Sequence, residues 1–391
     1  MLQRGRSFIQ LPGPTNIPDR VLAAMHRPVV DFAGPEFTRM TRSCLEDLKP
    51  VFQTQGEVFP YVALGHGMWE VVLDNLVAPG DAVLVPDTGR FSASWCEMIR
   101  AQGIELLTTS PFYRESVDPA AVEETLRADR GHRIKALLMV QVETSTGVLH
   151  DVAAVRRAID AAGHPALLVV DAVASLATVD LPMDAWGVDA TITASQKGLM
   201  MPPGMGFVAV GPRARKAALA NTAPRKYWDW GSRRGEESYM WFYGTPPLQM
   251  IWGLRAALDM LLEEGMPAVF ARHARLAEAA RKAVAHWSEA GALEFQALAP
   301  AARSNAVTAV RFTQGDPEAV RLHCRDELQV AFGGGLGQFQ GQILRIGHMG
   351  DLNEPMLLGA LAVLETGLRR LDVPHRPGGV TAAVEWLATQ R

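Results

Sequence analysis

The sequence contains little cysteine, no recognisable zinc motif and no long apolar run. Its three cysteines, Cys44, Cys96 and Cys324, are far apart and form no CxxC pair, which excludes a disulfide framework and indicates reduced thiols in a cytoplasmic protein. The ten histidines form neither HExxH nor a zinc-type spacing with cysteine, so we expect no metal site. No apolar run approaches the roughly 20 residues that cross a bilayer.

An excess of one charge is also missing. The formal net charge is −4, from 38 Lys and Arg against 42 Asp and Glu, so nothing favours binding to nucleic acid. The first residues carry scattered charge and an early Pro-Gly-Pro in place of the apolar core of a secretion signal. The 48% hydrophobic and 20% charged residues are ordinary for a globular protein, and 391 residues predict two or three domains.

The first half of the chain alternates short apolar runs with segments of helical spacing. Continuous apolarity, rich in Val, Leu and Ile, is typical of strands buried on both faces. The predicted strands are 81–86, 103–109, 134–143, 166–173, 188–195 and 205–211. The predicted helices between them are 67–78, 90–102, 117–128 and 151–162. This alternation predicts an α/β fold with a mostly parallel sheet covered on both faces.

The pattern changes towards the C-terminus. Long helices are predicted over about 246–264 and 267–290, and the apolar runs 305–312 and 342–348 then stand as isolated strands between helices. This indicates a smaller α+β domain. The glycine-rich stretch 332–338 lacks the spacing of a dinucleotide-binding loop, so we interpret it as a flexible turn.

Lys197 is the first candidate for chemistry. It follows the predicted strand 188–195 and precedes a Pro-Pro-Gly break. A lysine in apolar surroundings at the end of a sheet should have a lowered pKa, which makes its amine nucleophilic towards an aldehyde. A solvated surface lysine is the simpler interpretation of Lys197 taken alone.

Asp171 is the second candidate. It ends the buried strand 166–173, where a carboxylate is costly unless a charged or hydrogen-bonding group faces it. A protonated pyridine nitrogen is one such group, and an acid beside it makes the ring an electron sink. A helix N-cap or a metal ligand would explain Asp171 equally well.

A turn at 63–70 opens a predicted helix directly after an apolar stretch. The backbone N–H groups of Gly65, His66 and Gly67 at a helix N-terminus would form an anion site suited to a phosphate. The turn is not a dinucleotide motif, because Glu70 stands where that motif needs glycine.

Taken together, these motifs resemble one family. DAVAS, SQKG and RIGH occur in the order and spacing of the fold-type I, class V aminotransferases, in particular the alanine/serine/aspartate–glyoxylate branch. The segments VPHRPGGV, YWDW and YGTPP are similar to the bacterial serine–glyoxylate enzymes. The resemblance covers nearly the whole chain through the segments 11–18, 34–37, 75–85, 143–148, 195–198, 227–230, 243–247, 344–350 and 373–380.

The resemblance implies a pyridoxal 5′-phosphate enzyme of fold type I. It implies a large cofactor domain over 19–265 with a mostly parallel sheet, and a smaller α+β domain over 266–391. An N-terminal arm, 1–18, would pack on the small domain and the active site. The enzyme would be a homodimer with shared active sites.

The resemblance also implies roles for cofactor residues. Lys197 would hold the cofactor covalently and move a proton, and Asp171 would pair with the pyridine nitrogen. Phe91 and Val173 would flank the ring, and Thr144 would approach its phenolic oxygen. The phosphate would be held by Gly65, His66 and Gln196 in a loop that includes Leu64, and by Tyr243 and Thr245 of the neighbouring subunit.

The substrate side is implied in the same way. Arg345 would bind the substrate carboxylate through two parallel hydrogen bonds, and Pro12 and Gly13 would line the pocket. Phe32 lies in a loop that approaches the partner's substrate in relatives. There, relatives often carry a His-Arg or Tyr-Arg pair in place of Phe32-Ala33, so this pocket is more apolar and less cationic. Leu64 replaces the usual Ser or Thr of the phosphate loop.

The activity implied is a ping-pong transfer of the amino group of a small L-amino acid to a 2-oxo acid. Glyoxylate is the favoured acceptor and serine the favoured donor, with alanine or aspartate as alternatives. Three further alternatives stay open: a pyridoxamine–pyruvate enzyme, a lyase or desulfurase of the same fold, and a non-catalytic binding module. A nucleotide-dependent dehydrogenase, from a different class, would leave Lys197, Asp171 and Arg345 unexplained.

Overall fold

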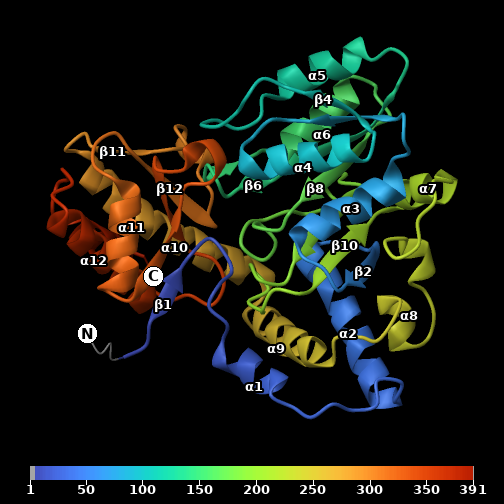
Figure 1. Ribbon diagram of the computed structural model, residues 1–391, viewed down its shortest axis with the longest axis horizontal. Coiled ribbons are helices and arrows are strands. Elements are labelled where there is room, and N and C mark those ends of the chain that lie inside the picture. The colour runs from blue at the N-terminus through green and yellow to red at the C-terminus, as the bar shows by residue number, and fades with distance from the viewer. Residues whose placement is uncertain (1–4, 391) are drawn as a thin grey trace.

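The computed structural model, which describes residues 5–390, contains a large and a small sheet, each covered by helices (Figure 1). The large sheet joins strands β4, β3, β5, β8 and β9 in parallel, while β10 runs antiparallel to both β9 and β2. All six predicted strands belong to it, so the expected mostly parallel sheet is confirmed. In spatial order its strands are β2 (Glu57–Tyr61), β10 (Gly206–Val210), β9 (Ala190–Ala194), β8 (Leu167–Asp171), β5 (Ile134–Val140), β3 (Ala82–Val85) and β4 (Glu105–Thr108).

The two faces of this sheet carry separate apolar clusters, as the alternation of side chains along a strand requires. In β8, Leu168 and Val170 belong to one cluster and Val169 to the other. The first cluster is covered by α2 (Pro35–Phe52), α5 (Pro119–Ala128), α6 (Val152–Ala161) and α9 (Leu248–Glu264). The second is covered by α3 (Gly65–Leu76), α4 (Arg90–Ala101) and α7 (Pro212–Ala220). Helices on both faces explain why the strands are continuously apolar.

The small sheet has the order β1-β13-β14-β12-β11 and its own apolar cluster. The predicted strands 305–312 and 342–348 are its β12 and β14. The sheet comprises β1 (Phe8–Gln10), β13 (Val330–Gly334), β14 (Ile343–Gly347), β12 (Val307–Phe312) and β11 (Leu293–Phe295). Its helices are α10 (Met266–Ser288), α11 (Pro317–Asp326), α12 (Glu354–Arg370) and α13 (Gly379–Ala388).

The interpretation of 332–338 as a flexible turn is wrong in its first half, because Phe332–Gly334 belongs to β13. A Cβ at Gly333 would lie 2.9 Å from Cδ of Pro12 and 3.2 Å from Cβ of Arg345. Glycine therefore serves close packing at this point and not flexibility.

The N-terminal segment links the two sheets. β1 pairs in parallel with β13, and Gln10 Nε2 donates a hydrogen bond to the carbonyl oxygen of Gly347. Further along, Thr15 N donates to the carbonyl oxygen of Gln196 at 3.1 Å. Residues 1–4 of the predicted arm lie outside the described residues, and the domain limits at 18 and 265 stay predictions.

The remaining helical segments are short, and the described chain offers no helix suited to crossing a membrane. These segments are α1 (Asp19–Met25), α8 (Ser238–Phe242) and the 3₁₀ turns η1 (Trp230–Ser232), η2 (Pro300–Ala302) and η3 (Gly337–Phe339). Over residues 5–390, no helix is both long and apolar enough to span a bilayer, and no three His, Cys, Asp or Glu side chains gather as metal ligands would.

Two glycines at the C-terminal end test the packing of the small sheet's helices. A Cβ at Gly379, the first residue of α13, would overlap the indole of Trp287, whereas a Cβ at Gly359 in α12 would meet no atom within 4 Å. We expect Gly379→Ala to lower the free energy of unfolding by about 1–3 kcal/mol. Gly359→Ala should raise it by about 0.5–1 kcal/mol through helix propensity. Urea titrations of both variants check the opposite signs, and two equal shifts would contradict the account.

Candidate active site

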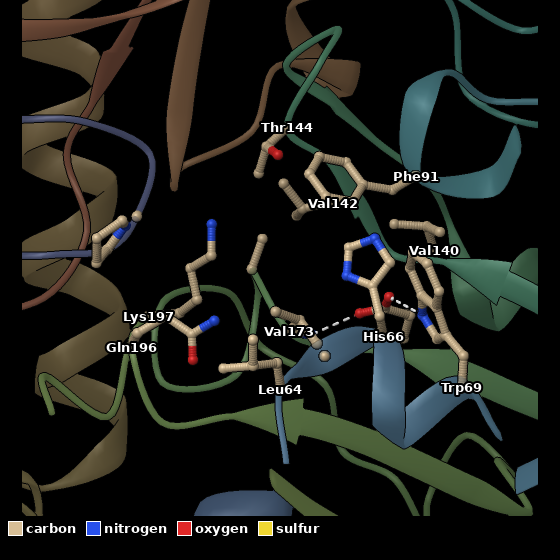
Figure 2. Close-up of a pocket in the computed structure, with 15 residues that line it drawn as sticks. Leu64, His66, Trp69, Phe91, Val140, Val142, Thr144, Val173, Gln196 and Lys197 are labelled. Carbon is tan, nitrogen blue, oxygen red and sulfur yellow. Dashed lines mark hydrogen bonds between the residues drawn. The ribbon is translucent and has the colours of Figure 1, made fainter. Parts of the chain in front are cut away.

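A cavity of about 280 Å³ lies where β5 and β8 end and α3 begins (Figure 2). The carboxyl edge of a parallel sheet is the usual place for a ligand in this kind of fold. The cavity brings together these predicted site residues: Gly13, Leu64, Gly65, His66, Phe91, Thr144, Asp171, Val173, Gln196 and Lys197. Residues from the N-terminal segment and from five other parts of the chain therefore meet at one point.

Lys197 lies three residues beyond β9 and is partly buried. Its Nζ donates a hydrogen bond to the carbonyl oxygen of Pro12. The pKa of Lys197 is lowered to about 8, mainly by burial and also by the positive charge of Arg345, while the carboxylates of Asp171 and Glu143 oppose both effects. A buried amine with a lowered pKa is what the sequence predicts, and a solvated surface lysine is excluded.

Asp171 is the last residue of β8 and is buried. Its Oδ1 accepts a hydrogen bond from Val173 N at 2.7 Å, and its Oδ2 accepts one from Trp69 Nε1 at 2.7 Å. Burial raises the pKa of Asp171 to about 6 against these two hydrogen bonds and the charge of Lys197. A carboxylate has about four acceptor positions, so acceptor capacity remains on a group that lines the cavity.

Trp69 is a residue that the sequence analysis missed. It lies one turn into α3 and lines the cavity. Its ring stacks on that of Trp95, with centroids 5.6 Å apart, and meets Phe91 edge-on at 6.5 Å. Trp69 therefore fixes the orientation of Asp171 from a packed aromatic cluster. The only signal in the sequence is a tryptophan one turn into the helix of the phosphate loop.

The N-terminus of α3 presents unpaired donors. Leu64 is the N-cap and contributes no side-chain hydrogen bond, and Met68 N is the first amide of the helix to bond back, to the carbonyl oxygen of Leu64 at 3.1 Å. The amides of Gly65, His66 and Gly67 are thus left for a ligand. Within residues 5–390, the buried Oε1 of Gln196 also has no hydrogen-bond partner.

Figure 2 shows Lys197 on one side of the cavity and the rings of His66 and Phe91 on the other, with Val173 between Leu64 and His66. Val140 and Val142 complete the apolar wall. From the sequence these two valines are predicted only as parts of a strand, because nothing in an apolar run tells which end faces a ligand.

Arg345 reaches the site from β14 of the small sheet. Its Nε donates to the carbonyl oxygen of Gly334 at 2.7 Å and its Nη1 to that of Thr144 at 3.1 Å. Burial lowers the pKa of Arg345 to about 10, so the guanidinium stays charged at neutral pH. Both of its described partners are neutral carbonyls, which leaves a buried cation able to bind an anion.

Arg345 and four other predicted residues do not line this cavity. Pro12 contacts it only through Lys197. Phe32 is half-buried against the first apolar cluster of the large sheet. Tyr243 and Thr245 are exposed after α8. The roles predicted for Phe32, Tyr243 and Thr245 involve a partner subunit and stay predictions.

The sequence profile of the family described as aminotransferase class-V matches residues 11–338. The chain belongs to the class-V aminotransferase family. It is 43% identical to a serine–glyoxylate aminotransferase of Methylorubrum extorquens, over 98% of this chain and 96% of the relative. It is 40% identical to an L-aspartate–glyoxylate aminotransferase of Paracoccus denitrificans, over 96% and 95%. Among solved structures, a pyridoxamine–pyruvate aminotransferase of Mesorhizobium loti is similar with a TM-score of 0.91, at 27% identity and full coverage of both chains.

Membership makes the protein a pyridoxal-phosphate-dependent aminotransferase of fold type I. The site fits that cofactor, because it combines a buried amine, a buried acid, unpaired amides at the start of α3 and the orphaned amide oxygen of Gln196. Its volume of about 280 Å³ lies just below the ~300–1,000 Å³ usual for small-molecule sites. When bound, pyridoxal phosphate supplies the electron sink that lets a proton leave the substrate's α-carbon.

The desulfurase alternative has no support in the cysteines. A desulfurase needs a cysteine on a mobile loop, and Cys324, the candidate that the sequence analysis considered, is buried in α11. Burial raises the pKa of its thiol to about 12, so it is not nucleophilic near neutral pH.

The lowered pKa of Lys197 predicts how attachment of the cofactor depends on pH. Only the neutral amine attacks an aldehyde, so the rate at which the cofactor-free protein takes up pyridoxal phosphate should rise with pH and level off near the pKa of about 8. Stopped-flow absorbance measures this rate. Nα-acetyl-lysine, with a pKa of roughly 10.4, is the control at each pH, and a protein profile that follows the control would contradict the prediction. Borohydride reduction should leave the label on the peptide that contains Lys197.

Proposed function

We propose that this enzyme transfers the amino group of a small L-amino acid, with serine favoured, to glyoxylate in two half-reactions at one site. The observation that carries the proposal is the identity of 43% to a serine–glyoxylate aminotransferase over 98% of the chain. It is supported by a small cavity that Lys197 lines, and by one buried arginine, Arg345, which does not line the cavity but whose charge helps to lower the pKa of Lys197. A single arginine suits small substrates that carry one carboxylate.

The residues divide the work as follows. Arg345 would bind the carboxylate of amino acid and 2-oxo acid in turn, through the guanidinium edge that the carbonyls of Gly334 and Thr144 leave open. Lys197 would accept the α-proton as a neutral amine and give it up again within the same half-reaction, which completes a 1,3-proton shift. Asp171, held by Trp69, would keep the pyridine nitrogen protonated.

Aspartate is the second candidate donor, because a relative at 40% identity is an L-aspartate–glyoxylate aminotransferase. Its side-chain carboxylate would need a second cation. Within residues 5–390, Lys197 is the only lysine or arginine that lines the cavity. His66 lines it too, but burial lowers the pKa of His66 and Arg90 lowers it further, so its ring is neutral at pH 7. These charges favour serine.

The pyridoxamine–pyruvate alternative is less favoured. The solved enzyme of that type is similar at a TM-score of 0.91 but only 27% identical. In such enzymes we expect an acidic residue in the phosphate loop, and here neither Leu64 nor His66 is acidic. The open amides of α3 favour a phosphorylated cofactor instead.

We also propose a homodimer in the cytoplasm, with the domain limits given above. Tyr227, Tyr239 and Tyr243 each expose about two fifths of their surface, and the rings of Tyr227 and Tyr243 lie 6.4 Å apart. Exposed tyrosines are enriched at protein interfaces. A partner seated there would allow Tyr243 and Thr245 to reach its phosphate. The three buried, unpaired cysteines suit a reducing compartment.

A panel of donors tests the substrate. With glyoxylate as acceptor, we expect kcat/KM for serine to exceed that for aspartate by about tenfold or more, because a desolvated carboxylate without a cation costs over 1.4 kcal/mol. Loss of the cofactor's absorbance on mixing with serine, alanine or aspartate measures each first half-reaction. Aspartate as the fastest donor would contradict the assignment. Turnover of free pyridoxamine with no bound phosphate would favour the alternative enzyme.

Arg345→Ala tests the shared clamp. Removing two charge-assisted hydrogen bonds, worth about 1.5 kcal/mol each, should raise KM by roughly 100-fold for the amino acid and for the 2-oxo acid alike. Arg311→Ala, on the neighbouring strand β12, is the control, because Arg311 is partly exposed and forms an ion pair with Glu294 at 3.6 Å, away from the cavity lining. An effect on one of the two substrates alone would contradict a common clamp.

A further inference from the structure

Glu143 is a buried carboxylate that the roles assigned so far leave unexplained. It ends β6 (Val142–Glu143), which forms a hairpin with β7 (Val148–Leu149), and none of its surface is exposed. Within residues 5–390, no lysine, arginine or histidine nitrogen lies within 4 Å of its carboxylate oxygens to form an ion pair. A buried carboxylate without a cation is costly unless several donors satisfy it.

Four donors satisfy Glu143, and two of them belong to the first turn of α4. Its Oε2 accepts hydrogen bonds from Phe91 N at 3.1 Å and Ser92 N at 3.3 Å. Its Oε1 accepts from Ser145 N at 3.1 Å and from Ser145 Oγ at 2.6 Å. The hydroxyl oxygen of Ser145 accepts in turn from Arg90 N at 3.0 Å. The hairpin thus caps α4 from outside, where the helix dipole favours a negative charge.

The approach of the hairpin to α4 depends on Gly89, the N-cap residue. A Cβ at Gly89 would lie 2.6 Å from Ser145 Oγ and 2.8 Å from Glu143 Cγ. Its φ of +146° is also one that side chains rarely adopt. The sequence therefore leaves space at this position for the carboxylate.

This cap joins three groups of the active site. Phe91, whose ring lines the cavity, is held by its own amide. Thr144 lies between Glu143 and Ser145, so both of its neighbours are fixed. The carbonyl oxygen of Thr144 accepts the hydrogen bond from Arg345 Nη1. The negative charge of Glu143 also raises the pKa of Arg345 and of Lys197 against their burial.

We propose that Glu143 is a positioning residue, which fixes Phe91 and Thr144 against the cofactor ring and, through the Thr144 carbonyl, orients Arg345 towards the substrate carboxylate. The proposal rests on the roles of Phe91, Thr144 and Arg345 proposed above. It implies that one buried carboxylate couples the cofactor half of the site, on the large sheet, to the carboxylate clamp on the small sheet.

Glu143→Gln tests the proposal, because the amide has nearly the same size but one acceptor oxygen and an NH₂ group that faces donors. We expect the dissociation constant of pyridoxal phosphate from the cofactor-free protein, measured by equilibrium dialysis, to rise by about tenfold or more. KM for the amino acid and for the 2-oxo acid should each rise by about tenfold, and more than kcat falls. Glu123→Gln, which removes a carboxylate from the surface of α5, is the control and should change none of these.

Ser145→Ala is the second variant, for the case that Glu143→Gln does not fold. It removes one donor to Glu143 and the acceptor of Arg90 N while Ser145 N stays in place. We expect the same dissociation constant and KM values to rise by about threefold. The proposal is overturned if each variant that folds keeps these constants within twofold of the parent, even where its melting temperature falls.

The experiments keep this proposal separate from the proposed function. If Arg345→Ala leaves both KM values unchanged, the clamp is wrong and the dissociation constant of the cofactor alone tests Glu143. If Arg345→Ala behaves as expected while the Glu143 and Ser145 variants match Glu123→Gln, the function stands and the positioning role falls.

Discussion

The site depends on holding an amine and a carboxyl group inside one apolar cavity. Burial lowers the pKa of Lys197 to about 8 and raises that of Asp171 to about 6. The amine therefore loses its proton far more easily than an ordinary lysine, and the carboxyl group is still an anion at neutral pH. Both groups carry a cost of desolvation. It is offset by fixed partners, Trp69 and Val173 N for Asp171 and the Pro12 carbonyl for Lys197. Much of the surrounding structure serves to keep those partners in place.

The residues proposed to act on the substrate come from both sheets, and this limits where a substrate could bind. Lys197 and Asp171 follow strands of the large sheet, whereas Arg345 belongs to the small one. Contacts across the boundary keep their relative positions: Thr15 donates from its amide to Gln196 O at 3.1 Å and from its hydroxyl to Lys197 O at 3.1 Å, and Arg345 donates to Thr144 O. The N-terminal segment takes part because β1 is a strand of the small sheet. Backbone carbonyl oxygens therefore hold both groups in place, that of Pro12 for Lys197 and those of Thr144 and Gly334 for Arg345.

The sequence predicts the central strands and the two groups at their ends, because burial on both faces leaves a continuous apolar run and an acid or amine at its end stands out. It does not predict partners that are remote along the chain. Trp69 is 102 residues from Asp171, and Glu143 lies 51 residues from Ser92. Composition and periodicity indicate which side of a helix or strand is buried, but not which other buried group a given side chain contacts. The stretch 332–338 fails for a related reason, since a glycine that permits close packing looks like one that permits motion.

The charges of the cavity connect burial to the choice of substrate. A carboxylate that enters loses its hydration, so it must meet a cation that is already desolvated and held in place. Arg345 meets that condition, because burial has already weakened its hydration and two carbonyls fix its plane. A second carboxylate would face His66, whose lowered pKa leaves it neutral, and the apolar side chains of Leu64 and Phe91. Desolvation of this second carboxylate would have no cation to offset it. A dicarboxylic donor would therefore bind less well than a donor with a small neutral side chain.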